Sequence, residues 1–379
     1  MNRQDPYVSI IVPVRNAERT IDTTLSYLTA LDYPTDRLEV ILADGGSTDS
    51  TVAVIERWQE RYPQLRLVKV PNCRTPGHAR NAALKVAVGE FVLFTDGDCA
   101  PEPDWVRQIL RPFFMDERIG GVGGEVLTLR TDPDNETEEY CEQVKFLSVC
   151  GRCGVAESGY FPGLCARAPH EVSGGDFSPF FATANAAFRR AAIDAVGGRF
   201  WDEPTGEDVD FSLRVLQRGY RLYFAREAVV KHMHRVSLAS FLKQWYGYGF
   251  GHPLLVREHA RDGLEVVIQL GRPHFLHLPS PIKGIVHLGY FHLAHLSLLA
   301  ALGSGLSAAF TPAALPALAA SLGVFALSAA AYFAPCLWLK PRRRLLTWCK
   351  IRYLTNWALI RGALDGSRRF GAICLEPSW

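Results

Sequence analysis

The sequence lacks an excess of either charge. Its 379 residues contain 41 Lys and Arg against 39 Asp and Glu, which gives a net charge of +2. A protein whose main partner is a nucleic acid carries a basic surplus, so this balance argues against that class. Apolar residues make up 48% of the chain and charged residues 21%, which excludes intrinsic disorder. The length predicts one large catalytic-sized unit and a smaller one.

The chain also lacks a regular cysteine framework, and its first 20 residues contain only a five-residue apolar run. That run is too short for the core of a signal peptide, so we expect the N-terminal portion in the reducing cytosol. Cys150 and Cys153 form a single CxxC motif near Cys141 and Cys165. Without a second correctly spaced pair we interpret this cluster as loop thiols in an insertion at about 130–180, with a zinc site as the alternative.

The most marked absence is that of charge between Gly284 and Leu339, where 56 residues include no Asp, Glu, Lys or Arg. This length covers two bilayer spans, predicted near 284–302 and 315–339, with a turn between them. The residues expected to break the helix there are Gly303, Gly305, Pro312 and Pro316. A buried helical pair in a soluble core is the alternative.

Basic residues flank this uncharged stretch, which by the positive-inside rule predicts both flanks in the cytoplasm. They are Lys283, Lys340, Arg342, Arg343 and Arg344. We expect residues 236–283, in which aromatic and basic residues mix, to be an amphipathic interfacial segment, with ordinary packing as the alternative. Residues 284–339 are predicted to be a transmembrane helical hairpin, and residues 340–379 a cytosolic tail with a second interfacial helix.

Residues 1–235 alternate short apolar strands with amphipathic helical stretches, which is typical of an α/β sheet. Strands are expected at 8–14, 38–43, 65–70 and 91–95, and a helix with Asn16 as its N-cap is expected after the first. Asp44 and Asp96 each follow an apolar strand. Because ligands of open α/β sheets bind at the carboxyl ends of the strands, both acids are candidate binding residues.

Asp96, Gly97 and Asp98 place two carboxylates two residues apart on a loop beside a glycine. Mg²⁺ usually takes one or two protein carboxylates and leaves its other positions to water and phosphate. The motif therefore suits a nucleoside diphosphate bound through a metal, although one such pair is a weak signal by itself.

Six blocks in order strengthen that interpretation. They are VSIIVPVRN at 8–16, VILADGGSTDST at 40–51, PGHARNAAL at 76–84, FVLFTDGDC at 91–99, ANAAFRR at 184–190 and GEDVDFSLRVLQRGYRL at 206–222. With them the chain resembles the family 2 glycosyltransferases over roughly residues 8–235. The resemblance implies an α/β GT-A (Rossmann-like) fold for residues 1–235, a nucleotide-sugar donor, a divalent metal (Mg²⁺ or Mn²⁺) and inversion at the anomeric carbon.

The resemblance also implies roles for individual residues. Asp98 is the expected metal ligand and Asp96 is shared between the metal and the donor ribose, while His234, with His232 near it, is a further candidate. Asp208 is the expected catalytic base. The donor would contact Pro13, Arg15, Asp44, Arg80, Asn81 and Asp96. The acceptor side would include Asn185, Glu207, Gln244 and Trp245.

This sequence departs from the family pattern at two places. Many relatives have a Thr before the Glu-Asp pair, where this chain has Gly206. The Gln-x-x-Arg-Trp motif of processive synthases lacks its Arg here, since Gln244 is followed directly by Trp245. The second departure argues for the addition of one sugar per encounter.

Together these features predict a membrane-attached inverting glycosyltransferase. We expect it to move a sugar from a nucleotide donor, with a UDP-sugar as the expected donor, to a lipid-linked saccharide in polysaccharide or glycan biosynthesis. It would be a multi-pass protein of the cell (inner) membrane with a cytoplasmic catalytic domain and no nucleic-acid partner. The alternatives are a polyprenyl-phosphate glycosyl synthase and a non-catalytic membrane scaffold that binds nucleotide sugars.

Overall fold

A computed structural model describes residues 5–153, 155–161 and 180–375, without the side chains of Arg152 and Cys153. The chain divides into two compact units, and the second begins at Leu238. Cys165 lies outside the described residues.

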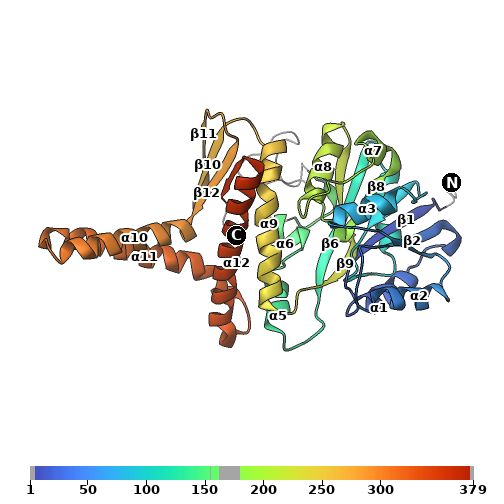
Figure 1. Ribbon diagram of the computed structural model, residues 1–379, viewed down its shortest axis with the longest axis horizontal. Helices are drawn as coiled ribbons and strands as arrows, with labels where there is room; N and C mark the ends of the chain where they lie inside the picture. The colour runs from blue at the N-terminus through green and yellow to red at the C-terminus, as the bar shows by residue number, and fades with distance from the viewer. Residues whose placement is uncertain (1–4, 154, 162–179, 376–379) are drawn as a thin grey trace. The chain divides into compact units, whose positions relative to one another are not determined.

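The first unit is built on a mixed sheet with the order β3-β2-β1-β4-β8-β6-β9-β5, and β7 pairs with β9 (Figure 1). Its strands are β1 (Val8–Val14), β2 (Leu38–Asp44), β3 (Leu65–Lys69), β4 (Phe91–Phe94), β5 (Cys99–Pro101), β6 (Ile119–Leu129), β7 (Gly159–Tyr160), β8 (Ala186–Arg189) and β9 (Arg221–Met233). The first four strands pair in parallel, as expected. The antiparallel pairing of β8 with β4 and β6 was not predicted.

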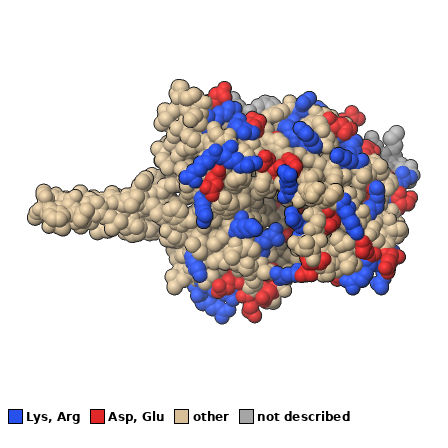
Figure 2. Space-filling view, viewed as in Figure 1, with Lys and Arg blue, Asp and Glu red and all other residues tan. Residues whose placement is uncertain are grey.

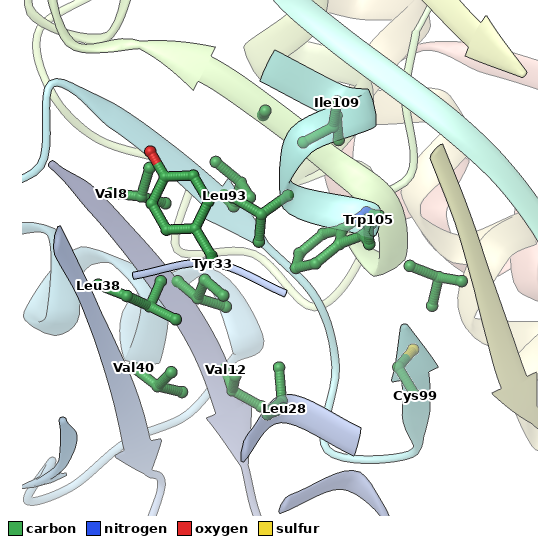
Figure 3. Close-up of a cluster of buried hydrophobic side chains, with 14 of the residues drawn as sticks. Val8, Val12, Leu28, Tyr33, Leu38, Val40, Leu93, Cys99, Trp105 and Ile109 are labelled. Atoms are coloured by element: carbon green, nitrogen blue, oxygen red, sulfur yellow. The ribbon is translucent and has the colours of Figure 1, made fainter. Parts of the chain in front are cut away.

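Helices cover both faces of this sheet because alternate residues of a strand point to opposite faces. The helices of this unit are α1 (Ile21–Thr29), α2 (Thr51–Gln59), α3 (Pro76–Leu84), α4 (Trp105–Leu110), α5 (Glu136–Gln143), α6 (Val149–Cys153), α7 (Arg190–Ala195) and α8 (Glu207–Gln217). Side chains of α1, α2 and α4 form one core with the even-numbered residues of β1 and β2 (Figure 3). A separate cluster consists of aromatic rings whose centroids lie 4.2–6.2 Å apart in the contacting pairs, namely those of Phe94, Phe188, Phe200 and Phe211.

The predicted N-cap at Asn16 is wrong. The helix begins at Ile21, and Asn16 has a left-handed backbone with φ 49°. Its side-chain Oδ1 instead accepts the backbone N–H of Thr48 at 2.9 Å, which ties the loop after β1 to the loop after β2. A single asparagine tolerates this backbone because its short polar side chain bonds locally.

The second unit combines a small sheet with four long helices. The strands are β10 (Leu264–Leu270), β11 (Arg272–Leu278), β12 (Gly284–Gly289) and β13 (Ile373–Leu375), in the order β11-β10-β12-β13. The helices are α9 (Leu238–His259), α10 (Tyr290–Ala308), α11 (Leu315–Phe333) and α12 (Leu345–Phe370). The helix expected in the tail is therefore present as α12.

The predictions for the second unit need corrections in both the apolar hairpin and the interfacial segment. Residues 284–289 form β12, because they pair with β10 and β13, so the first apolar helix starts at Tyr290 and not at Gly284. Gly303 and Gly305 lie within α10 and do not interrupt it, since glycine keeps the N–H that a helix needs. Pro316 lies in the first turn of α11, where a proline removes no helical hydrogen bond, so it does not interrupt that helix either. Residues 264–278 of the expected interfacial segment form a β-hairpin.

Candidate active site

The candidate site lies at the carboxyl ends of the parallel strands of the first unit. Asp44 ends β2, which pairs in register with β1, and Asp96 follows β4 on the other side of β1. Parallel strands bring their carboxyl ends to one edge of the sheet. Pro13 lies within β1 and Arg15 directly after it, so these residues belong to the same edge. Arg15 donates weakly to the carbonyl of Cys73, at 3.4 Å.

The buried carboxylate of Asp44 organises the turn that follows it. It accepts the backbone N–H groups of Gly46 at 3.2 Å and Ser47 at 3.1 Å. Gly46 has φ 84°, a conformation that glycine adopts without strain. Asp44 therefore has a structural role in the Gly-Gly turn. Its role toward a donor base stays a prediction.

Arg80 connects two parts of the site. Its side chain is 3% exposed, and it donates to Glu207 Oε1 at 2.6 Å and to Asp96 Oδ1 at 2.9 Å. Glu207 opens α8, whereas Asp96 follows β4, so one guanidinium ties the helix to the sheet edge. Charge-assisted bonds of this kind are strong and directional, and they fix the position of both acids.

The N-terminus of α8 carries Glu207 and Asp208 into this cluster. Gly206, which precedes them, has φ 86°, so glycine suits this position better than the Thr found in many relatives. Burial raises the pKa of Glu207 to about 7, and the adjacent Asp208 adds to that effect against the influence of Arg80. Burial also raises the pKa of Asp208. Of the neighbouring charges, Arg80 lowers this pKa and Asp96 raises it. These mutual effects show that Asp96, Arg80 and Asp208 share one electrostatic environment.

Asp98 lies beside the end of β9, which brings a histidine to it. His232 pairs with Cys99 across β5 and β9, and its Nε2 is 3.4 Å from Asp98 Oδ1. Burial raises the pKa of Asp98, and Asp96 raises it further, while His232 and Arg235 act in the opposite direction. The Nδ1 of His232 is buried with no hydrogen-bond partner in the described part of the chain.

These donors fit a divalent cation. Ligand atoms of Asp98, Cys99 and His232 lie within 4.8 Å of one another. Carboxylate oxygens suit Mg²⁺ and Mn²⁺, and imidazole binds transition metals. Cys99 belongs to the hydrophobic core (Figure 3), and burial raises the pKa of its thiol well above the usual value, so it stays protonated. Asp98 and His232, with Asp96 nearby, are the residues that could hold a metal.

His234, the further metal candidate, has another partner. Its Nε2 lies 2.9 Å from the hydroxyl of Thr128, and its ring stacks on His232 at 5.2 Å. Burial lowers the pKa of His234 to about 3, so the ring stays neutral. Residues two apart on a strand face the same way, and the pairing of β9 with β5 is what brings His232 to Asp98.

Two other predicted binding residues are engaged in the fold. Asn81 donates to the carbonyl of Phe200 at 2.9 Å and accepts its N–H at 2.8 Å, so it holds the segment before α8. Asn185 is 1% exposed, bonds the carbonyls of Glu125 and Ala228, and accepts from the indole N–H of Trp105. Asn185 lies in the core directly before β8, and its expected role on the acceptor side stays a prediction.

The remaining predicted residues lie elsewhere. Gln244 and Trp245 belong to α9 of the second unit, where Gln244 donates to the Tyr248 hydroxyl at 2.9 Å and Trp245 is buried against Phe241. Their acceptor role stays a prediction. Of the cysteines, Cys141 is buried and Cys150 lies on α6, where its thiol pKa is raised to about 12 by burial and by Glu125.

Sequence reasoning missed the joining role of Arg80 and the short contact of His232 with Asp98. Arg80 is 16 residues from Asp96 and 127 residues from Glu207 along the chain, so no local spacing could reveal the bridge. The available signal was the block PGHARNAAL, through which the resemblance already marked Arg80 as a donor-binding residue.

Comparison with known proteins shows the family and the fold of this chain. The family model described as glycosyl transferase family 2 matches residues 9–197, about half of the chain. Over 259 residues the chain is 24% identical to a dolichyl N-acetyl-alpha-D-glucosaminyl phosphate 3-beta-D-2,3-diacetamido-2,3-dideoxy-beta-D-glucuronosyltransferase of Methanococcus voltae, covering 66% of this chain. Over 214 residues it is 31% identical to the beta-monoglucosyldiacylglycerol synthase of Synechocystis sp., covering 55% of this chain.

The aligned regions span 74% of the archaeal protein but only 40% of the Synechocystis one. Among solved structures, the mannosyltransferase PcManGT of Pyrobaculum calidifontis, in complex with GDP-Man and Mn²⁺, is similar with a TM-score of 0.54 and 23% identity. That match covers 96% of this chain and 87% of the other, and it shows a shared fold. The chain belongs to glycosyl transferase family 2 and has a GT-A-like α/β sheet.

Proposed function

We propose that this chain is a metal-dependent inverting glycosyltransferase that moves a sugar from a UDP-sugar to a lipid-linked saccharide at a membrane surface. Membership of the family supports the transferase class. The observation that carries the proposal is the bridge from Asp96 through Arg80 to Glu207, next to Asp208. It brings candidate donor-side and base residues, far apart in the sequence, into one cluster.

The donor would lie at the carboxyl ends of β1, β2 and β4. Pro13, Arg15 and Asp44 would face its base, and Asp96 its ribose. Asp98, Asp96 and His232 would hold the divalent metal. When bound, the metal stabilises negative charge on the departing diphosphate as a Lewis acid. Arg80 would keep the Asp96 carboxylate in place for this role, because its guanidinium donates to Asp96 through one nitrogen and is held by Glu207 through the other.

Inverting transfer is a single displacement at the anomeric carbon. The acceptor oxygen forms a bond to C1 while the bond from C1 to the diphosphate oxygen breaks, and the diphosphate leaves with the electron pair. The acceptor proton must go to a base on the face opposite the leaving group, and we assign it to the carboxylate of Asp208. Its raised pKa makes this carboxylate a better proton acceptor than an ordinary exposed aspartate.

The second unit would attach the enzyme to a membrane. Two segments, Tyr290–Ala308 and Pro312–Trp338, are long and apolar enough to span a bilayer, and only 22% and 6% of them are buried. A helical pair in a soluble core would be covered by other elements. The visible face of the hairpin formed by α10 and α11 carries neither acidic nor basic residues (Figure 2). The names of the Methanococcus and Synechocystis relatives include a dolichyl phosphate and a diacylglycerol, which supports a lipid-linked acceptor.

The test of the proposed reaction is Asp208→Asn in the full chain. Loss of the base should lower transfer by roughly 10²- to 10⁴-fold, while binding of the UDP-sugar with Mn²⁺ stays near the wild-type value. Transfer from labelled UDP-sugars to extracted lipid, and donor binding by calorimetry, measure the two effects.

Asp210→Asn is a matched control on the same helix, because Asp210 pairs with Arg214 at 2.7 Å and we assign it no catalytic role. Full transfer by the Asp208→Asn protein would contradict the assigned base. Donor binding without any transfer by the wild-type chain would favour a non-catalytic scaffold, and transfer to bare polyprenyl phosphate would favour the synthase alternative.

Membrane attachment is tested separately by a reporter fused after Trp379. A hairpin with basic residues on both flanks returns the chain to the cytoplasm, so we expect a cytosolic signal and resistance of the protein to extraction by alkaline carbonate. A periplasmic signal, or release by carbonate, would contradict the membrane hairpin.

A further inference from the structure

Helices α9 and α12 of the second unit lie side by side (Figure 1). Glycines make their close approach possible. A side chain at Gly249 would clash with the carbonyl of Leu359, and one at Gly362 would clash with the carbonyl of Tyr246. Small residues at a helix crossing let the two backbones approach closely. The larger side chains beside the crossing then line a pocket whose walls are held in place by this packing.

Between these helices is a pocket of about 350 Å³. This size is within the range of small-ligand sites. Its walls are mainly apolar and come from Leu242 and Tyr246 of α9 and from Leu354, Trp357 and Ala358 of α12. Two cations, Lys243 and Arg361, complete the lining, one from each helix.

Neither cation is neutralised by a carboxylate. Lys243 and Arg361 are exposed, and among the described residues neither makes an ion pair or a hydrogen bond. The carboxylate on the same face of α12, Asp365, accepts from the Tyr246 hydroxyl at 3.0 Å and pairs with Arg368 at 3.1 Å. The pocket therefore offers an apolar wall and two free positive charges, which complement an anion that carries a hydrocarbon chain.

The pocket also adjoins the base of the apolar hairpin. Trp357 is 44% exposed, and its ring lies 5.6 Å from that of Phe291 and 5.2 Å from that of His295. Both of these residues belong to the first turns of α10. If α10 enters a bilayer, Trp357 lies where α10 enters it, the level at which tryptophan and the cationic ends of long side chains concentrate.

We propose that this pocket binds an anionic bilayer phospholipid, with the phosphodiester between Lys243 and Arg361 and an acyl chain along Leu354 and Trp357. The proposal rests on the proposed membrane attachment and not on the proposed sugar transfer. A soluble phosphate would leave the apolar wall uncovered, and a neutral lipid would leave both cations unpaired. The site would hold α9 and α12 against the membrane surface beside the hairpin.

The experiment uses the full chain purified in an uncharged maltoside detergent. Dioctanoyl phosphatidylglycerol is titrated, and the thermal unfolding midpoint reports binding, because a ligand that binds the folded state stabilises it. We expect a saturable rise with phosphatidylglycerol that weakens in high salt, and none with dioctanoyl phosphatidylcholine or inorganic phosphate. The double variant Lys243→Gln, Arg361→Gln should weaken the apparent affinity by about thirtyfold.

Arg343→Gln with Lys350→Gln is the matched control, since it removes two exposed cations of the same unit that do not line the pocket. It should keep the wild-type response. The proposal is overturned if both double variants respond like the wild type, or if farnesyl phosphate raises the midpoint and phosphatidylglycerol does not. Donor binding is measured on the same samples. Failure of donor binding with an intact lipid response would contradict the proposed function alone.

Discussion

Charged side chains form a cluster at each end of the same sheet, and the two clusters differ in how their charge is balanced. At the amino ends of β1 and β2, the buried Glu39 accepts from the Ser9 hydroxyl at 2.6 Å and the Val88 N–H at 2.9 Å, and it pairs with Arg66. One carboxylate there pairs with one guanidinium, so the charges of this cluster balance without a ligand.

At the carboxyl ends the balance is different. Three carboxylates, those of Asp96, Glu207 and Asp208, share one buried guanidinium, that of Arg80. Asp98 faces His232 and Arg235. Burial raises the pKa values of Asp98, Glu207 and Asp208, and a neighbouring carboxylate raises each of them further. The first cluster holds the fold, whereas the second is suited to receive a cation and to exchange a proton.

The largest effect that would test this contrast is expected from Arg80→Met. Removal of the buried guanidinium leaves Asp96 and Glu207 without their partner, which should lower the free energy of unfolding by about 3–5 kcal/mol. Transfer should fall as well, because the two acids lose their fixed positions. Urea unfolding and transfer assays measure the two losses.

Glu39→Gln is the control from the other cluster. It removes one charge from a satisfied network and should cost about 1–3 kcal/mol of stability, while transfer per folded molecule stays unchanged. If Glu39→Gln impaired transfer as strongly as Arg80→Met, the division between a structural and a functional cluster would be wrong.

The pH dependence of stability should also differ between the clusters. Burial and Asp208 raise the pKa of Glu207 to about 7, above its ordinary value near 4.5, so the folded protein binds more protons than the unfolded chain between these values. Stability therefore falls as pH rises from about 5 to 7, by at most about 1.4 kcal/mol per pH unit from this group.

Glu207→Gln should reduce this slope, and a smaller slope should remain because the pKa values of Asp98 and Asp208 are raised as well. Urea unfolding at several pH values without donor or metal measures it. An identical slope in Glu207→Gln and wild type would show that Glu207 does not titrate in this window.

The contrast also shows what the sequence could predict. Apolar runs and their endings predicted the parallel strands and the sheet-end acids Asp44 and Asp96, because strand period and strand ends are local properties. The antiparallel insertion of β8 between β4 and β6 depends on contacts between distant segments, and no local pattern encodes it. Asn185 illustrates the limit, since only this pairing places it in the core.

The different effects of proline and glycine on a helix decided which predicted helix breaks are present. Pro312 lies between the two apolar helices as predicted, whereas Gly303 and Gly305 stay helical. Glycine only weakens a helix, by roughly 1 kcal/mol, and the surrounding apolar residues outweigh that cost, while proline removes a hydrogen bond. The prediction missed β12 of the second unit, because an uncharged stretch of six residues such as GIVHLG is compatible with a strand and with the start of a helix.

The smallest expected effect concerns the two glycines at the ends of α8. Gly206 and Gly219 have φ 86° and 85°, so replacing either with alanine should cost a similar roughly 1–2 kcal/mol of stability through the left-handed backbone. Gly206 precedes Glu207 and Asp208, whereas Gly219 lies beyond the opposite end of the helix. Gly206→Ala should therefore also lower kcat, because it displaces Glu207 and Asp208 from the positions they take beside Arg80. Gly219→Ala should leave the kcat of the folded protein unchanged, and urea unfolding with transfer kinetics on both variants measures the difference. Equal kcat in the two variants would show that the start of α8 tolerates displacement, and that the surplus negative charge of the site, more than its exact geometry, sets the rate.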